Sequence, residues 1–280
     1  MQAARKTEIA LATTRELNLK KTFECGQCFR WNLLGDGSYV GVVGDKVLRI
    51  WERDETVLCD SNDADLPFWR RYFDMDMDYE AATSVFTQSD YLKACCEYGA
   101  GIRILRQEPW ETLISFIISQ LNSIPRIMQI INALCENFGR QLEVEHGNYY
   151  TFPDAQTLAH LTKADLSPLR CGYRADYIIN AALFVTSGGI DLDAIYHMQA
   201  DASSLALKQL RGVGDKVAHC VMLYGYHKMD AFPVDTWMKR ALKAHFPPDF
   251  NPSDLGPHAG LAQQYIFYYS RENKDRSCTA

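Results

Sequence analysis

The sequence predicts an α+β protein in which an antiparallel sheet is followed by a mostly helical body. Short runs of β-forming residues fill the first sixty positions, and turns at Gly35-Asp36-Gly37 and Gly44-Asp45 separate them as in β-hairpins. From about Pro67 the spacing of apolar residues changes to the period of helices. We therefore expect a sheet domain with flanking helices over residues 1–105 and a helical domain over residues 106–280.

Individual elements follow from the same patterns. A helix is expected to begin at Pro109, because proline suits the first helical turn. The next helix is expected to begin near Pro125 and to stop at Gly139. The expected strands cover residues 28–31, 39–43, 47–51 and 56–59, and the later helices cover residues 173–188, 202–210, 216–226, 236–246 and 259–271.

The composition is that of a globular protein with an ample core. Hydrophobic residues make up 47% of the 280 residues and charged residues 23%, which excludes an intrinsically disordered chain. Uninterrupted apolar runs reach only a few residues, so no membrane-spanning segment is expected. The nine cysteines are irregularly spaced, and no secretory signal is visible. Reduced thiols and a cytoplasmic location, nucleoid-associated in a bacterium, are therefore expected.

The net charge of −6 argues against a generally basic, nucleic-acid-coating surface. A local basic face is still compatible with this charge, because residues 201–246 hold seven lysines and arginines against four acids. Acidic residues elsewhere, as between Asp74 and Glu80, offset this surplus.

A glycine-rich hairpin joins two of the expected helices. Gly212, Val213 and Gly214 form it, and two glycines one residue apart allow a tight turn and a close backbone approach. The following helix begins with free backbone N–H groups, which suit one DNA phosphate. These features indicate a helix-hairpin-helix motif, which grips DNA independently of base sequence. An ordinary turn between helices is the alternative.

Two polar residues follow the hairpin. Lys216 opens the second helix, and Cys220 lies one turn further along the same face. Pro233 forces an extended approach that places Asp235 at the N-terminus of the next helix. A solvated surface lysine and a plain N-cap aspartate are the structural alternatives for Lys216 and Asp235.

Six segments along most of the chain resemble one family. Residues 210–220 followed by Phe232-Pro233-Val234-Asp235 are similar to the lysine-bearing branch of the helix-hairpin-helix DNA glycosylases, and within it to the 8-oxoguanine DNA glycosylase/lyase family. The resemblance implies a TBP-like N-terminal sheet and a helix-hairpin-helix glycosylase body. The other similar segments are Gly26-Gln27-Cys28-Phe29-Arg30-Trp31, Ser115-Phe116-Ile117-Ile118-Ser119 with Ile124-Pro125-Arg126-Ile127, Gly172-Tyr173-Arg174-Ala175, and Gly256-Pro257-His258-Ala259-Gly260-Leu261-Ala262-Gln263 with Phe267.

The resemblance implies a bifunctional DNA repair enzyme that flips 8-oxoguanine out of duplex DNA and excises it. In such an enzyme Lys216, as a neutral amine, attacks the anomeric carbon and leaves a Schiff base with the sugar. Strand cleavage then follows by β-elimination, which is the lyase step. Asp235 is expected to supply negative charge near the developing positive sugar and to assist proton movement.

The resemblance also implies which residues hold the lesion. The Gly26 carbonyl accepts from the N7–H that 8-oxoguanine has and guanine lacks, so guanine would leave two acceptors facing each other. Gln263 and Phe267 are spaced i, i+4, so the amide can read a base edge while the ring stacks on the base. Cys220 is expected to form the opposite wall. A turn glycine at Gly26 and core packing of Phe267 are the alternatives.

The gap left in the DNA stack needs a plug. The resemblance implies that Tyr173 is the wedge, and that Arg126 and Arg174 donate to the orphaned cytosine. The family commonly has asparagine where this chain has Leu121, so either Leu121 or Asn122 fills the orphan-base position. A strict preference for cytosine opposite the lesion is therefore an open question.

Other contacts and cofactors follow from the same reasoning. Animal members of the family carry histidine where this chain has Trp237, so that phosphate contact differs or uses the indole N–H. Cys25 and Cys28 have metal-ligand spacing, but no second pair completes a zinc site, and the four-cysteine cluster of iron–sulfur glycosylases is missing. No catalytic metal or redox cofactor is expected, and a structural monovalent cation at the hairpin is compatible with the sequence. The expected partner is double-stranded DNA containing 8-oxoguanine, bound by a monomer.

Two other functions stay open on the sequence. An alkylated-base DNA glycosylase of the same superfamily would share the architecture but lack the hairpin lysine. A non-catalytic helix-hairpin-helix DNA-binding module would need neither Lys216 nor Asp235.

Overall fold

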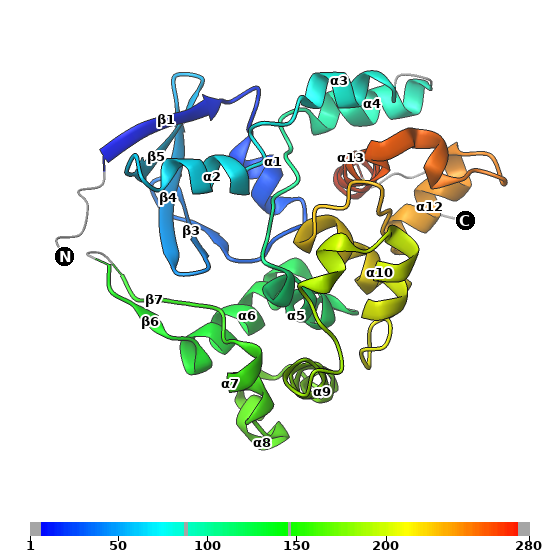
Figure 1. Ribbon diagram of the computed structural model, residues 1–280. Helices are drawn as coiled ribbons and strands as arrows, with labels where there is room; N and C mark the ends of the chain where they lie inside the picture. Colours follow the sequence, from blue (N-terminus) through cyan, green and yellow to red (C-terminus); the bar gives the residue numbers. More distant parts are fainter. Residues whose placement is uncertain (1–6, 87–88, 145–146, 274–280) are drawn as a thin grey trace.

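The computed structural model describes residues 7–86, 89–144 and 147–273 (Figure 1). A five-stranded antiparallel sheet occupies the N-terminal half, and helices form most of the rest, which confirms the expected α+β class. The strands are β1 (Thr7–Thr13), β2 (Trp31–Leu33), β3 (Tyr39–Val43), β4 (Lys46–Arg53), β5 (Thr56–Ser61), β6 (Gln141–Leu142) and β7 (Tyr149–Tyr150). The α-helices are α1 (Leu19–Glu24), α2 (Leu66–Tyr72), α3 (Tyr79–Ser84), α4 (Asp90–Gly99), α5 (Pro109–Ser119), α6 (Ile124–Phe138), α7 (Ala155–Ala159), α8 (Lys163–Leu166), α9 (Arg174–Thr186), α10 (Ala200–Leu207), α11 (Asp215–Cys220), α12 (Thr236–His245) and α13 (Ala259–Glu272).

The sheet has the strand order β1-β5-β4-β3-β2, with every neighbouring pair antiparallel. Strands β3, β4 and β5 lie where the sequence predicts them. Asp54 and Glu55 take left-handed backbone angles and close the tight β4–β5 hairpin. One face of the sheet packs on aromatic residues, among which Phe23 of α1 stacks on Trp31 at 4.2 Å between ring centres. This aromatic layer fixes α1, and with it the segment that follows α1.

The structure differs from the expected strands in two places. Residues 28–30 form no strand, and the buried Gln27 side chain just before them bonds to the backbone of residues 103 and 105. Its amide nitrogen donates to the Arg103 carbonyl (2.7 Å), and its oxygen accepts from the Leu105 N–H (2.9 Å). Strand β1 has no clear signal in the sequence, because it lies at the sheet edge and buries only Leu11 of its seven residues.

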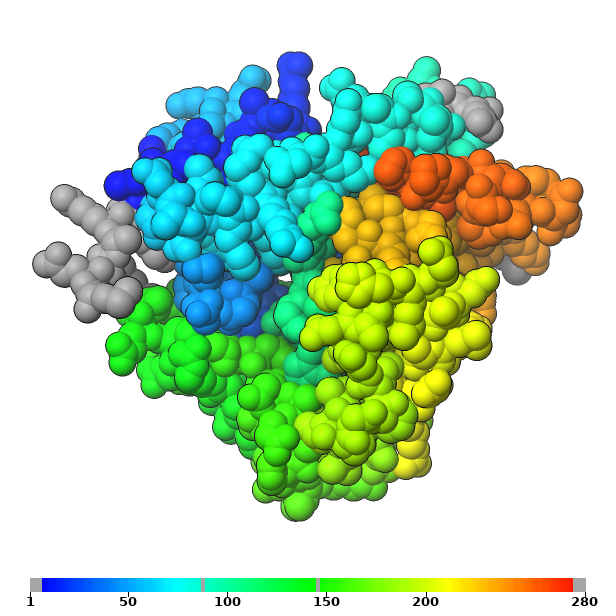
Figure 2. All heavy atoms as spheres, in the orientation of Figure 1, coloured from blue at the N-terminus to red at the C-terminus, as the bar shows by residue number. Residues whose placement is uncertain are grey.

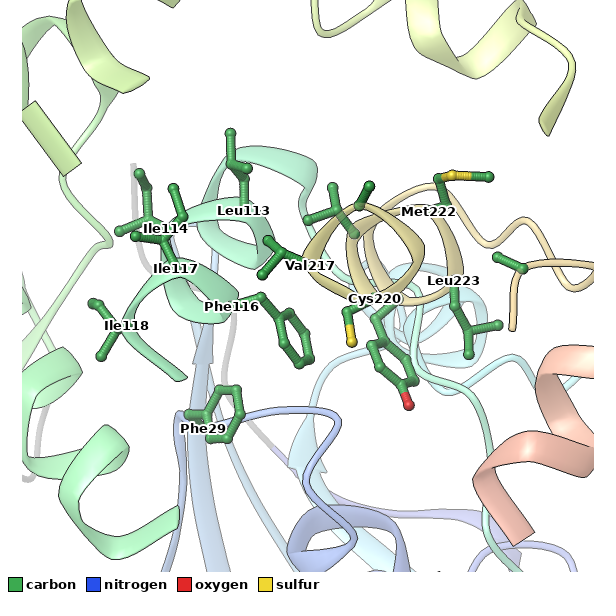
Figure 3. Packing of buried hydrophobic residues seen from close by; sticks show 14 of the residues in the cluster. Phe29, Leu113, Ile114, Phe116, Ile117, Ile118, Val217, Cys220, Met222 and Leu223 are labelled. Atoms are coloured by element: carbon green, nitrogen blue, oxygen red, sulfur yellow. The ribbon is translucent and has the colours of Figure 1, made fainter. Parts of the chain in front are cut away.

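Helix α5 is the centre of the helical body. Nine of its eleven residues are buried, so it is covered on nearly every side. Figure 3 shows Leu113 and Phe116 of α5 beside Val217 and Cys220 of α11. Each buried side chain of this size contributes roughly 1.5–3 kcal/mol, so this packing holds α11 firmly against α5. Within the described ranges, no helix combines the length and apolar character needed to cross a membrane.

The helix starts and stops largely follow the expected signals. Helix α5 begins at Pro109, and α6 ends with Gly139 as its C-cap. Helix α11 differs from its expected range, because it ends at Cys220 and continues as a π-helical turn over Val221–Gly225. A π-helical turn widens the helix locally and is frequent at functional sites.

The C-terminal helix α13 returns to the N-terminal half. It packs against α12 and α4, and Figure 1 shows it beside these elements. The Tyr91 hydroxyl of α4 lies 2.9 Å from the Ser270 hydroxyl of α13. In Figure 2 the N-terminal half, blue to cyan, contacts both the green helices and the yellow-to-orange C-terminal part.

A buried cluster around Asp74 also joins the two halves. The Asp74 side chain is 2% exposed, and its carboxylate lies 2.8 Å from the Arg106 guanidinium, 2.9 Å from the Tyr79 hydroxyl and 3.0 Å from His227 Nε2. Burial raises the pKa of Asp74, but His227 and Arg106 outweigh burial and hold the pKa below its usual value. Because His227 closely follows the π-helical turn, the cluster ties the lysine-bearing helix to the N-terminal half.

We predict that Asp74→Asn lowers the free energy of unfolding by about 3 kcal/mol at neutral pH, because His227 and Arg106 lose the charge of a buried carboxylate. The folded-state pKa of Asp74 lies below the unfolded value, so the carboxylate stabilises the fold above about pH 4 and loses its effect as the pH falls through the folded pKa. Urea unfolding of the wild-type protein and of Asp74→Asn at several pH values measures the difference in their free energies of unfolding. The difference should shrink in acid, and a difference independent of pH would contradict the assignment.

Candidate active site

A pocket lined by residues of both halves brings together most of the residues predicted to act on a lesion. It contains both predicted catalytic residues and all four predicted lesion-contacting residues. The walls come from the segment after α1, from α5, from α11 with its π-helical continuation, from the loop before α12, and from α13. The lining residues are Gly26, Phe116, Lys216, Cys220, Tyr224, Pro233, Asp235, Gln263 and Phe267.

Lys216 lies in the first turn of α11 and is half-buried. Its Nζ is 3.4 Å from the Ser119 Oγ and 4.8 Å from the centre of the Phe116 ring. Helix α5 therefore presents a hydroxyl group and an aromatic ring to the amine. These contacts hold the amine at the pocket wall.

The Cys220 thiol forms an uncharged part of the wall. Burial raises its pKa to about 11, although the positive charge of Lys216 acts in the opposite direction. A thiol with this pKa stays protonated at neutral pH, so it is not a nucleophile there. Figure 3 shows Cys220 beside Phe116, where α11 meets α5. The pair offers a polarisable apolar surface for a flat base.

Asp235 is half-buried and caps the N-terminus of α12. Its Oδ1 accepts from the Met238 N–H at 2.8 Å, which fixes the carboxylate at the pocket. The preceding segment is held to α11, because His219 Nδ1 lies 3.1 Å from the Phe232 carbonyl oxygen. Trp237 follows Asp235 and is half-buried, with the Arg240 guanidinium 5.6 Å from its ring.

Gly26, Gln263 and Phe267 form the other side of the pocket. Gly26 has φ +88°, which a residue with a side chain rarely adopts, and this geometry turns the chain directly after α1. Gln263 is 4% exposed, and its Oε1 is buried without a hydrogen-bond partner in the described chain. An unpaired buried oxygen facing a pocket is typical of a group kept for a ligand.

The predicted phosphate hairpin is packed on two helices. Gly212 has φ +87°, and a Cβ there would lie 2.4 Å from the Tyr177 ring of α9. Its carbonyl accepts from Gln120 Nε2 at 3.1 Å, at the end of α5. Val213 is buried, whereas Gly214 is exposed at the N-cap of α11. The hairpin is thus anchored on one side and open on the other.

Two apolar side chains project from loops near this hairpin. Leu121 is 93% exposed and has φ +50°, and Tyr173 is 49% exposed. An exposed leucine with left-handed backbone is unfavourable for folding alone. Asn122 is half-buried, and its amide donates to the Ile118 carbonyl at 3.3 Å. Of the two candidates for the orphan-base position, Leu121 therefore projects and Asn122 is held back.

The two arginines predicted to contact cytosine are occupied by backbone carbonyls. Arg174 is 9% exposed, and it donates to the Gln120 carbonyl at 2.9 Å and the Leu121 carbonyl at 3.2 Å. Arg126 donates to the Arg170 carbonyl at 3.1 Å. In this state both guanidinium groups brace the loops that carry Leu121 and Tyr173. Contact with a cytosine requires an exchange of some of these bonds.

In the described chain, no group of three or more His, Cys, Asp or Glu side chains is arranged to hold a metal ion. Cys25 and Cys28 are both buried, and burial raises the pKa of each thiol. Their sulfur atoms lie near the backbone carbonyls of Thr22 and Phe23, respectively. They are therefore core residues, in spite of their metal-ligand spacing.

Comparison with known proteins agrees with this geometry. Residues 9–113 match the family model "8-oxoguanine DNA glycosylase, N-terminal domain", and residues 114–255 match "HhH-GPD superfamily base excision DNA repair protein". The N-glycosylase/DNA lyase of Saccharomyces cerevisiae is 34% identical, over 86% of this chain and 71% of the yeast protein. The chain belongs to the 8-oxoguanine DNA glycosylase family.

Two further relatives of this 8-oxoguanine glycosylase chain cover it almost completely. The Arabidopsis thaliana N-glycosylase/DNA lyase OGG1 is 29% identical, over 92% of this chain and 74% of the plant protein. The solved Clostridium acetobutylicum 8-oxoguanine glycosylase/lyase, in complex with double-stranded DNA containing cytosine opposite 8-oxoguanine, has a TM-score of 0.87 and 35% identity. That likeness covers 98% of this chain and 100% of the clostridial chain. The family and fold class expected from the sequence segments are thereby confirmed.

Three lining residues of this glycosylase pocket were not predicted to line it. Phe116 and Tyr224 stack with 5.4 Å between ring centres, and Pro233 completes the wall before Asp235. The sequence does contain one indication that Tyr224 lines the pocket. Tyr224 follows Lys216 and Cys220 at intervals of four residues, which is typical of one helix face. Tyr224 itself lies in the π-helical turn that follows Cys220.

Proposed function

We propose that this protein excises 8-oxoguanine from duplex DNA and then cleaves the strand as a lyase, with Lys216 as the nucleophile. The observation that carries the proposal is the pocket in which Lys216 and Asp235 lie among Gly26, Gln263 and Phe267. The names of the relatives, N-glycosylase/DNA lyase and 8-oxoguanine glycosylase/lyase, support the same reaction.

The chemistry needs an amine, and Lys216 supplies it. Nζ forms a bond to the anomeric carbon while the N-glycosidic bond breaks, and the base leaves with the electron pair and takes up a proton. Opening of the sugar ring then gives a protonated imine. This imine acidifies the neighbouring C2′ position, so loss of a C2′ proton expels the 3′ phosphate and cuts the strand. Asp235, fixed by its cap bond, stabilises the positive charge that develops on the sugar.

Lesion selectivity comes from the opposite side of the pocket. The Gly26 carbonyl accepts from N7–H of 8-oxoguanine, the Gln263 amide contacts the base edge, and Phe267 and Cys220 enclose the base faces. Guanine lacks the N7 proton, so it would leave the Gly26 carbonyl unpaired. The cost of an unpaired buried acceptor, about 1–3 kcal/mol, corresponds to roughly 5- to 150-fold discrimination.

The DNA is held by the surrounding loops. Gly212, Val213 and Gly214 contact a phosphate through the backbone, and the Trp237 indole contacts another. Leu121 and Tyr173 fill the gap left by the flipped nucleotide, since both are exposed beside the hairpin. Leucine cannot hydrogen-bond to the orphaned base, so the preference for cytosine depends on Arg126 and Arg174. One chain carries every one of these residues, and the protein acts as a monomer.

We predict that Lys216→Gln abolishes both base release and strand cleavage while DNA affinity is retained, because glutamine is polar but has no nucleophilic amine. The loss in single-turnover rate should exceed about a thousandfold. Duplexes with each of the four bases opposite 8-oxoguanine are used, and Lys93→Gln, an exposed lysine of α4, is the matched control. Retained base release by Lys216→Gln would remove Lys216 from the mechanism. A wild-type protein that binds DNA but leaves 8-oxoguanine in place would point to a binding module or an alkylated-base glycosylase.

We predict that Asp235→Asn slows base excision by about 100- to 10,000-fold without weakening DNA binding. Asparagine can keep the cap bond to Met238, so the change removes the charge and spares α12. Asp154→Asn is the matched control, because Asp154 caps α7 in the same manner through the Thr157 N–H. Single-turnover excision rates are measured for both variants. An unchanged rate for Asp235→Asn would rule out a catalytic role for Asp235.

A further inference from the structure

Arg271 lies next to two residues that line the lesion pocket, Gly26 and Phe267. It follows Gln263 and Phe267 at i+8 and i+4, so the three share one face of α13. Its Nη2 donates to the Glu24 carbonyl at 2.8 Å, two residues before Gly26. Its Nη1 lies 3.6 Å from the point that a Cβ of Gly26 would occupy, and Phe267 Cε1 lies at the same distance from that point. The guanidinium carbon is 5.5 Å from the centre of the Phe267 ring.

The guanidinium group is not fully satisfied by these contacts. Nη1 is buried and has no hydrogen-bond partner in the described chain, while Nη2 also pairs with Glu272 at 2.8 Å. Burying an unpaired N–H of a charged group disfavours folding, and an apolar side chain would avoid this cost. The arginine therefore leaves one buried N–H unpaired, which an apolar side chain at this position would not do. Its contacts with Gly26 and Phe267 point instead to the pocket.

Recognition of the lesion by the Gly26 carbonyl requires that the backbone at Gly26 is held in a fixed position. A glycine has no side chain to anchor it, and Gly26 takes a left-handed conformation. The two carbonyls before it are instead held from α13, that of Glu24 by Arg271 and that of Cys25 by Gln264 Nε2 at 3.4 Å. A hydrogen bond weakens steeply when its angle is lost, so a loose Gly26 carbonyl would discriminate poorly.

We propose that Arg271 is a positioning residue for lesion recognition, which holds the Gly26 carbonyl and the Phe267 ring in one fixed geometry. This inference rests on the proposed function, because it concerns how the same pocket selects its base. Arg271 therefore acts on base excision, which needs a bound base. It has no part in strand cleavage after base loss, since a preformed abasic site places no base between Gly26 and Phe267.

The test compares two substrates for each protein. Arg271→Met keeps an unbranched side chain and removes the hydrogen bonds, so single-turnover excision of 8-oxoguanine should fall at least about tenfold. Strand cleavage at a preformed abasic site should stay within about twofold of wild type, because Lys216 and Asp235 are untouched. Arg271→Lys should recover part of the excision rate, since an ammonium can still donate to the Glu24 carbonyl. Arg53→Met is the matched control, as Arg53 is an exposed arginine of β4 paired with Glu8.

The outcomes separate this inference from the proposed function. Unchanged 8-oxoguanine excision by Arg271→Met, or an equal loss on both substrates, would overturn the positioning role. If Arg271→Met does not fold, the ratio of the two rates for Arg271→Lys decides, and an unchanged ratio overturns the role. A wild-type protein that cleaves abasic sites but does not excise 8-oxoguanine would instead overturn the proposed substrate.

Discussion

The return of helix α13 onto the segment after α1 is the constraint on which the site depends. Gln264 donates to the Cys25 carbonyl at 3.4 Å across 239 residues of sequence, and the Tyr224 hydroxyl donates to Gln264 Oε1 at 2.6 Å. These bonds link the π-helical turn after Lys216 to the segment that carries Gly26. Closing so long a loop costs chain entropy, which the packing of α13 on α4 and α12 offsets. The pocket is therefore a property of the whole chain.

Within the pocket, the polar groups are divided between those that the fold satisfies and those that it leaves for a ligand. Asp235 is committed to its cap bond, whereas the Gln263 oxygen has no partner in the described chain. The Cys220 thiol, with a pKa raised by burial to about 11, adds no charge beside Lys216. The exposed, left-handed Leu121 is a similar case on the DNA-facing loops. Such unfavourable local features are typical of sites whose partner arrives from outside.

The sequence predicts the parts of this molecule whose signals are local. Pro109 and Gly139 mark helix boundaries through their own backbone chemistry, and Gly212 marks the hairpin because only glycine avoids the Tyr177 ring. Sequence segments that resemble the family also name most of the pocket residues. Features that depend on contacts between distant parts of the chain cannot be predicted from such local signals. The bonds of the Gln27 side chain, just before residues 28–30, depend on the segment near residue 104, and the inward bonds of Arg174 depend on a loop more than fifty residues away.

The most direct test of the Lys216 mechanism is to reduce the covalent intermediate with borohydride and to locate the attachment by peptide mapping. Wild-type protein is incubated with duplex DNA containing 8-oxoguanine, and borohydride converts the imine into a stable amine. We predict one covalent adduct, with the sugar attached to the peptide that contains Lys216. Attachment to another lysine, or base release without any trapped adduct, would contradict the claim that the Lys216 amine carries the reaction.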